Sequence, residues 1–164
     1  MSLGAHELDA LYRRHAAMVF RRAQRLLRND AEAQELVQDL FLSLLDRPTQ
    51  LKEKGSVTGW FYTATTHACL NRLRDQRNRA RLLAQRGDEP ARAHGFSADA
   101  RALLHDALAR LPTDLAEVAV YAFFDELSQE EIAPLIGCSR RQVGILIERV
   151  RAWGREQESL CSSP

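Results

Sequence analysis

The stretch LSQEEIAPLIGCSRRQV, residues 127–143, contains two helix starts on either side of one glycine. Ser128 is followed three residues later by Glu131, and Ser139 is followed three residues later by Gln142. In such a capping box, the serine hydroxyl and the longer side chain each accept a hydrogen bond from a backbone amide that the helix leaves unpaired. The glycine suits the left-handed position that closes a helix. The stretch therefore predicts two short helices joined by a tight turn.

Two short helices joined in this way are typical of a helix-turn-helix, whose second helix offers its N-terminal residues to base edges in the major groove. Those residues here are Arg140, Arg141 and Gln142. Guanidinium groups suit guanine, and a side-chain amide suits adenine. An ordinary helical hairpin with solvated arginines is the alternative, because the same geometry is also a common packing motif.

The rest of the chain also favours helices over strands. It contains 24 Leu and 23 Ala but only 7 Val and 4 Ile, a balance that favours helix. Apolar side chains recur at helical spacing over roughly residues 5–28, then over residues 30–47, and again over residues 57–85. Asn29-Asp30 provides a break and a helix cap between the first two of these segments. Similar spacing predicts a helix that Pro112 ends, and another over residues 113–126.

Two segments interrupt this helical pattern. PTQLKEKGS is a polar loop before the long third helix, and RGDEPARAHGFS has two glycines, a proline and no apolar period. The second segment is typical of a linker. We therefore predict an all-α chain with two small helical lobes, residues 1–86 and residues 99–164, joined by a flexible linker at residues 87–98.

The two halves differ in charge, although the whole chain has a net charge of only +1. Residues 1–86 carry 15 basic and 9 acidic side chains, a net +6, whereas residues 87–164 carry 8 basic and 13 acidic side chains, a net −5. The chain has 21 Arg and 2 Lys, and the planar guanidinium of Arg suits phosphates and base edges. The split indicates that the first half faces a polyanion, whereas the second depends less on bulk charge.

Sequence signatures of enzymes and metal sites are missing. The chain has no glycine-rich phosphate loop, HExxH or GxSxG motif, and its three cysteines lack paired metal-ligand spacing. His67 and Cys69 are two residues apart and so do not share a helix face. We therefore expect no enzymatic activity, no metal and no cofactor. Without a membrane-length apolar run or a leader segment, we expect a reduced, cytoplasmic protein that does not insert into membranes.

The long helix predicted over residues 57–85 begins with Trp60, Phe61 and Tyr62 and ends with several arginines. Aromatic faces beside a cationic track suit single-stranded nucleic acid, which binds through stacking and phosphate neutralisation. Phe61 lies on the expected core side of the helix. Helical spacing leaves the burial of Trp60 and Tyr62 open.

Three segments, in this order, resemble the extracytoplasmic-function (ECF) sigma factors, the small bacterial type with only conserved regions two and four. ELVQDLF, residues 35–41, is similar to a signature of region two. GWFYTATTHACLNRLRD, residues 59–75, is similar to the region-two helix that contacts the minus-ten promoter element. LARLPTDLAEVAVYAFFDELSQEEIAPLIGCSRRQVGILIERVR, residues 108–151, resembles region four. The resemblance covers nearly everything from Leu8 to Arg155.

The resemblance implies a protein that binds bacterial core RNA polymerase and promoter DNA and directs transcription initiation. Polymerase would be bound by Glu35, Gln38 and Asp39. The minus-ten strand would be bound by Leu51, Lys52, Lys54, Ser56, Trp60, Tyr62, His67, Asn71, Arg72 and Arg74. The minus-thirty-five element would be bound by Ser139, Arg140, Arg141, Gln142, Arg149 and Arg151. The resemblance further implies an anti-sigma factor as a partner, and we expect the free protein to be a monomer.

Two departures from the family pattern bear on DNA binding. His67 stands where many relatives carry Asn, and Gly144, Ile145 and Leu146 replace positions that are commonly basic or polar. These departures keep two other functions open. A sigma-like interaction protein would keep the fold without specifying a promoter. A plain helix-turn-helix regulator would bind DNA without polymerase, although it would leave the ELVQDLF segment unexplained.

Overall fold

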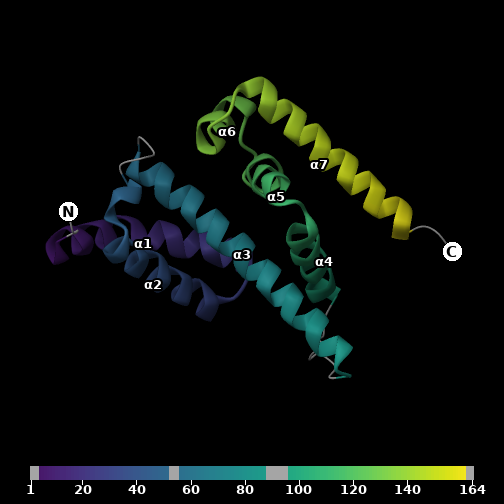
Figure 1. Ribbon diagram of the computed structural model, residues 1–164, viewed down its shortest axis with the longest axis horizontal. Coiled ribbons are helices and arrows are strands. Elements are labelled where there is room, and N and C mark those ends of the chain that lie inside the picture. The colour runs from purple at the N-terminus through teal and green to yellow at the C-terminus, as the bar shows by residue number, and fades with distance from the viewer. Residues whose placement is uncertain (1–3, 52–55, 88–95, 162–164) are drawn as a thin grey trace. The chain divides into compact units, whose positions relative to one another are not determined.

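The computed structural model describes residues 4–51, 56–87 and 96–161, and over these ranges the chain is helical without a β-strand (Figure 1). In chain order the elements are α1 (Ala5–Leu27), α2 (Asp30–Asp46), the 3-10 turn η1 (Pro48–Leu51), α3 (Val57–Gln85), α4 (Phe96–Arg110), α5 (Thr113–Ala119), the π turn η2 (Val120–Phe124), α6 (Gln129–Ile136) and α7 (Arg140–Cys161). The predicted all-α class is confirmed.

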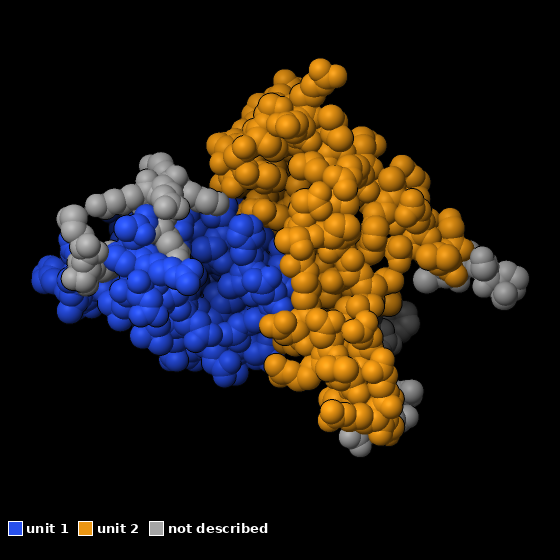
Figure 2. Space-filling view, in the orientation of Figure 1, with its two compact units in different colours: residues 1–72 blue, residues 73–164 orange. Residues whose placement is uncertain are grey.

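Two compact units make up the chain, residues 1–72 and residues 73–164 (Figure 2). The division falls within α3, between residues 72 and 73. The sequence predicted that the first lobe ends later, at residue 86. Residues 88–95 of the predicted linker lie outside the described residues. Its positions 96–98 belong to the first turn of α4, and the predicted lobe boundaries themselves stay a prediction.

The break between α1 and α2 is closed by one left-handed residue and one side-chain cap. Arg28 has a φ of +55°, and its N–H donates to the carbonyl of Gln24 at 2.9 Å. The side-chain oxygen of Asn29 then accepts the N–H of Glu32 at 3.2 Å, which satisfies an amide at the start of α2. The predicted Asn29-Asp30 break and cap are confirmed.

An aromatic cluster forms the centre of the first unit. Phe61 of α3 is fully buried, and its ring lies 5.0 Å from the ring of Phe41 on α2 and 4.7 Å from that of His15 on α1. Its predicted place in the core is confirmed. The surrounding buried aliphatic side chains are Val19, Ala23, Leu26, Leu36, Leu44 and Leu70. Since burying one such large side chain contributes roughly 1.5–3 kcal/mol, this cluster holds the first half of α3 against α1 and α2.

The second unit has its core where α5, η2 and α6 meet α7. Its fully buried side chains are Val118, Val120, Tyr121, Ile132 and Val143. The helix predicted over residues 113–126 is interrupted, because the N–H of Asp125 donates to the carbonyl of Val120 at 2.9 Å, a π turn. A π turn accommodates an extra residue, and here the two neighbours Val120 and Tyr121 both enter the core.

Candidate nucleic-acid interface

α6 and α7 form the helix-turn-helix that the two capping boxes predicted. At the start of α6, the Ser128 N–H donates to the Glu131 carboxylate at 2.8 Å and the Glu131 N–H donates to the Ser128 hydroxyl at 3.3 Å. These bonds hold the pKa of the Glu131 carboxyl below its usual value. Between the helices Gly137 has a φ of +79°, a left-handed conformation that glycine adopts without steric cost. This cap and the turn are confirmed.

The cap of α7 uses Gln142, which changes what this side chain can do for DNA. The Ser139 N–H donates to the side-chain oxygen of Gln142 at 2.9 Å, and the Gln142 N–H donates to the Ser139 hydroxyl at 3.2 Å. Recognition of adenine uses both the oxygen and the nitrogen of an amide. A bidentate contact of Gln142 to adenine would therefore require the capping box to open, whereas its side-chain NH2 group stays available as a donor with the box closed.

The predicted DNA-binding arginines of α7 differ in their neighbours. Three of them form ion pairs: Arg140 with Glu130 at 2.9 Å, Arg149 with Asp114 at 3.1 Å, and Arg151 with Glu148. Such exposed pairs contribute little stability, so a phosphate can compete for them. Arg141 is exposed and, among the residues that the structure describes, has neither an ion pair nor a hydrogen bond. It is the arginine most available to a base.

Arg141 borders an open groove of about 690 Å³ that runs along α6 and α7. The groove is lined by Gln129, Arg141, Gly144, Ile145, Glu148, Arg149, Ala152 and Arg155. Ile145 is 54% exposed, whereas Leu146 is half-buried. Of the atypical Gly144–Leu146 segment, Ile145 therefore points outward, whereas Gly144 is half-buried beside Gln129 of α6.

The aromatic start of α3 is less accessible than a stacking surface requires. Trp60 is only 6% exposed, and its ring packs edge-on against Phe61 with the ring centroids 5.0 Å apart. Stacking on a base would need an exposed ring face, which this packing does not offer, and the predicted contact of Trp60 with the minus-ten strand stays a prediction. The sequence pattern could not separate the two cases, since both place an aromatic residue at the same helical position.

Tyr62 is half-buried and is covered by a cation that the sequence analysis missed. The guanidinium of Arg22 on α1 lies 3.6 Å from the centre of the Tyr62 ring. Its Nε and Nη2 also donate to the Thr66 hydroxyl at 3.0 and 2.9 Å. Arg22 is buried, and it follows His15 and Val19 at the helical spacing of the core face, which is the signal that could have identified it.

The arginines of α3 are also partly engaged. Arg72 forms ion pairs with Asp39 at 2.7 Å and with Glu35 at 3.3 Å. A residue predicted to bind DNA thus contacts two residues predicted to bind polymerase, both on α2. Of the other predicted minus-ten residues on α3, His67 and Asn71 are exposed, whereas Arg74 is half-buried and its Nη2 is buried without a hydrogen bond.

Further along α3, within the second unit, the cationic track continues with one paired and two exposed arginines. Arg77 donates from Nε to Asp106 of α4 at 2.8 Å. Arg79 and Arg81 are exposed. For these two, no ion pair to any described residue is present.

The predicted loop contribution to the minus-ten site is described only in part. Lys52 and Lys54 lie outside the described residues. Leu51 ends η1 and is half-buried, so the polar loop expected here begins with a 3-10 turn. Ser56 is exposed, and its hydroxyl accepts the N–H of Gly59 at 3.3 Å, which places it at the N-terminus of α3.

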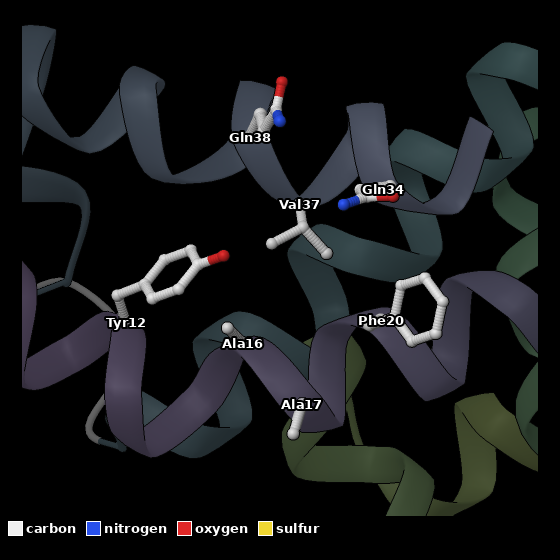
Figure 3. Close-up of a pocket in the computed structure, with 7 residues that line it drawn as sticks. All are labelled: Tyr12, Ala16, Ala17, Phe20, Gln34, Val37 and Gln38. Carbon is white, nitrogen blue, oxygen red and sulfur yellow. The ribbon is translucent and has the colours of Figure 1, made fainter. Parts of the chain in front are cut away.

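The predicted polymerase-binding residues share the exposed face of α2. Glu35, Gln38 and Asp39 are exposed, while Leu36 and Val37 between them are buried. Figure 3 shows a groove of about 350 Å³ beside this face, with the Tyr12 ring of α1 and the Gln38 side chain of α2 on its two sides. The groove is lined by Tyr12, Ala16, Ala17, Phe20, Gln34, Val37 and Gln38.

Metal-ligating side chains do not cluster in the part of the chain that the structure describes. No group of three or more His, Cys, Asp or Glu side chains there could hold a metal ion. Burial raises the pKa of the Cys69 thiol to about 12, which leaves it protonated and unreactive. Burial, with a smaller contribution from Arg14, lowers the pKa of His15. None of the described helices is long and apolar enough to span a membrane.

Two family models match the chain, in the order that the sequence predicted. Sigma-70 region 2 matches residues 11–79, and Sigma-70, region 4 matches residues 101–153. The first match contains α2 and most of α3, and the second contains α6, the turn after it and α7 as far as residue 153.

Several curated proteins are similar over most of the chain. The ECF RNA polymerase sigma factor SigE of Mycolicibacterium smegmatis is 32% identical over an alignment of 157 residues, which covers 91% of this chain and 59% of that protein. The RNA polymerase sigma factor CarQ of Myxococcus xanthus is 33% identical over 135 residues, covering 80% of this chain and 77% of that protein. The ECF RNA polymerase sigma factor SigM of Mycobacterium tuberculosis is 26% identical over 148 residues, covering 90% and 74%. The chain thus spans less than two thirds of SigE but about three quarters of the other two.

Proposed function

We propose that this chain, which belongs to the ECF subfamily of RNA polymerase sigma factors, binds bacterial core RNA polymerase and directs initiation at specific promoters. The observation that carries the proposal is the presence of both matched regions in one chain. Region 2 supplies an exposed acidic helix face, and region 4 supplies a capped helix-turn-helix with an exposed arginine at its second helix. A helix-turn-helix regulator alone would not require the first of these.

Polymerase binding is assigned to the outward face of α2. Its residues Glu35, Gln38 and Asp39 stand above the buried side chains of Leu36 and Val37, so a partner can contact them without disturbing the core. The adjoining groove between α1 and α2 offers further apolar contact (Figure 3). Charged residues at such an interface govern specificity and association rate more than total affinity.

Minus-ten binding is assigned to the first two-thirds of α3. The exposed residues His67 and Asn71 can reach an unpaired strand, and Tyr62 is held in place by Arg22. Enzymes that take a base out of a duplex need such fixed stacking and polar groups. Arg72 would bind the strand after its ion pair with Asp39 opens. It would then exchange one exposed acceptor, the Asp39 carboxylate, for another, a phosphate of the strand.

Minus-thirty-five binding is assigned to Arg141, with Arg140 and Arg149 available for phosphates. Because tethered lobes raise the effective concentration of the second contact, a weak second lobe can still contribute on one promoter. The finer assignments follow from the family and are part of the proposal: an anti-sigma partner, a monomer when free, a cytoplasmic location and no catalytic activity of its own.

The test is transcription in vitro with the purified full chain, bacterial core polymerase and a template pool randomised upstream of a reporter segment. We expect transcripts that depend on the added chain and start downstream of a shared pair of sequence elements. The matched control is the same core polymerase without the chain. Tight binding to core polymerase without transcripts from any template would instead favour the sigma-like interaction protein, and duplex binding without polymerase binding would favour a plain regulator.

A further inference from the structure

Ile145 is an exposed apolar side chain on α7 between two buried ones. It is 54% exposed, whereas Val143 and Ile147 on either side are buried and hold α7 to the core. Ile145 follows Arg141 by four residues, so the two side chains are neighbours on one helix face. Both line the open groove along α6 and α7.

Gly144 shapes the surface beside Ile145. A Cβ at this position would lie 3.4 Å from the side-chain oxygen of Gln129 on α6, so the absence of a side chain leaves room for Gln129 against the helix. Position 144 itself therefore adds no side chain beside Ile145. The long side chains that flank Ile145 in the groove are those of Arg141, Glu148 and Arg149.

The charges around this face argue that its ligand is duplex DNA. Arg141 at the helix start is unpaired among the described residues, and Arg140 and Arg149 beside the face are held only by exposed carboxylates. Among the described residues that line the groove, the one acidic side chain, Glu148, is paired with Arg151. A helix in the major groove presents its N-terminal turns to base edges. An apolar side chain there has one partner, the C5-methyl group of thymine.

We propose that Ile145 is a specificity-determining residue that contacts a thymine methyl group in the minus-thirty-five element, beside the base that Arg141 contacts. The inference rests on the proposed function, since it needs α7 in the promoter groove. Four helical residues rise about 6 Å, and base pairs are spaced about 3.4 Å apart. The thymine therefore lies one or two base pairs from the base bound by Arg141.

The experiment uses the full chain with core polymerase on a promoter selected from the randomised pool. Each thymine of the upstream element is replaced by deoxyuridine, which removes only the methyl group. We expect one thymine whose replacement weakens promoter binding about fourfold, the factor for burying one methyl-sized group. With Ile145→Ala that replacement should have no effect. Leu160→Ala, an exposed leucine near the end of α7, is the matched control and should keep the wild-type sensitivity.

The outcomes separate this inference from the proposed function. A selected promoter without any methyl-sensitive thymine would overturn the role of Ile145 and leave the sigma-factor function standing. The same would follow from unchanged sensitivity in Ile145→Ala, with Ile145 then free to contact a protein. Failure to select any promoter would overturn both.

Discussion

α3 begins with Trp60 and Phe61 packed into the core of the first unit, whereas α7 begins with Ser139 and Gln142 capping the backbone and Arg141 exposed beside them. Both helices have the residue types expected of a nucleic-acid surface. In α3 the aromatic side chains at the helix start fix the helix in the fold. In α7 the caps close the helix start, and Val143 and Ile147 hold the helix to the core. The difference teaches that a side chain at a helix start becomes available for a ligand where other residues already hold the helix.

The largest effect that we expect concerns how firmly α3 is held. Thr66→Val removes the acceptor of two hydrogen bonds from the buried Arg22, and hydrogen bonds to charged groups contribute about 1.5–3 kcal/mol. The free energy of unfolding should fall by that amount in denaturant titrations of the full chain. Thr65→Val is the matched control, because Thr65 is equally buried but donates only to the carbonyl of Phe61. Equal losses in the two variants would mean that the Arg22 contact adds nothing.

The comparison predicts a smaller, purely functional effect at the start of α7. Arg141→Ala should lose roughly 1–3 kcal/mol of discrimination at one base pair if the guanidinium makes a bidentate contact to guanine. Arg140→Ala is the matched control, since Arg140 pairs with Glu130 and should change affinity similarly for all sequences. Promoter binding by the complex with core polymerase, measured on single-base variants of the upstream element, provides both values. If Arg140→Ala loses base discrimination and Arg141→Ala does not, Arg140 rather than Arg141 is the residue that reads the base.

A third prediction concerns the exposed face of α2. Asp39→Lys should weaken binding to core polymerase by about tenfold, because it places a like charge against a complementary surface. Asp39 also pairs with Arg72, which Glu35 binds as well, so Asp39→Asn is needed as the control that removes the Asp39 ion pair without reversing the charge. Titration of labelled core polymerase measures both variants, with helicity checked by circular dichroism. If both bind as the original chain does, polymerase contacts another face.

The smallest effect is expected in the C-terminal part of α3. Arg79 is exposed, whereas Arg77 pairs with Asp106. Each neutralised phosphate of a single strand contributes about 0.7 to the slope of log affinity against log salt. Arg79→Ala should therefore flatten this slope by about 0.7, and Arg77→Ala by less. Salt titrations of the full chain on a single-stranded fragment give the slope for each variant. A larger change of slope in Arg77→Ala than in Arg79→Ala would show that the ion pair with Asp106 does not keep Arg77 from the strand.

The sequence was sufficient for the features that depend on near neighbours. The bounds of α1 and α3, the Asn29 cap and the turn at Gly137 depend on residues within one helical turn, and the sequence predicted each of them. The burial of Trp60, the cover of Tyr62 by Arg22 and the pairing of Arg72 with α2 depend on helices distant in sequence. Helical periodicity carries no information on these contacts. The π turn at Val120–Phe124 likewise follows from core packing.

The central claim is a division of labour, in which the first half supplies affinity for a single strand and α7 supplies discrimination only within the polymerase complex. The most direct measurement compares the full chain, alone and bound to core polymerase, on single-stranded and duplex promoter fragments at increasing salt. Alone, the chain should prefer the single strand with a steep salt dependence that Arg79→Ala reduces, and should not discriminate among duplexes. Bound to polymerase, it should discriminate among duplexes through Arg141. Tight, sequence-specific duplex binding by the free chain at physiological salt, without single-strand binding, would contradict the account.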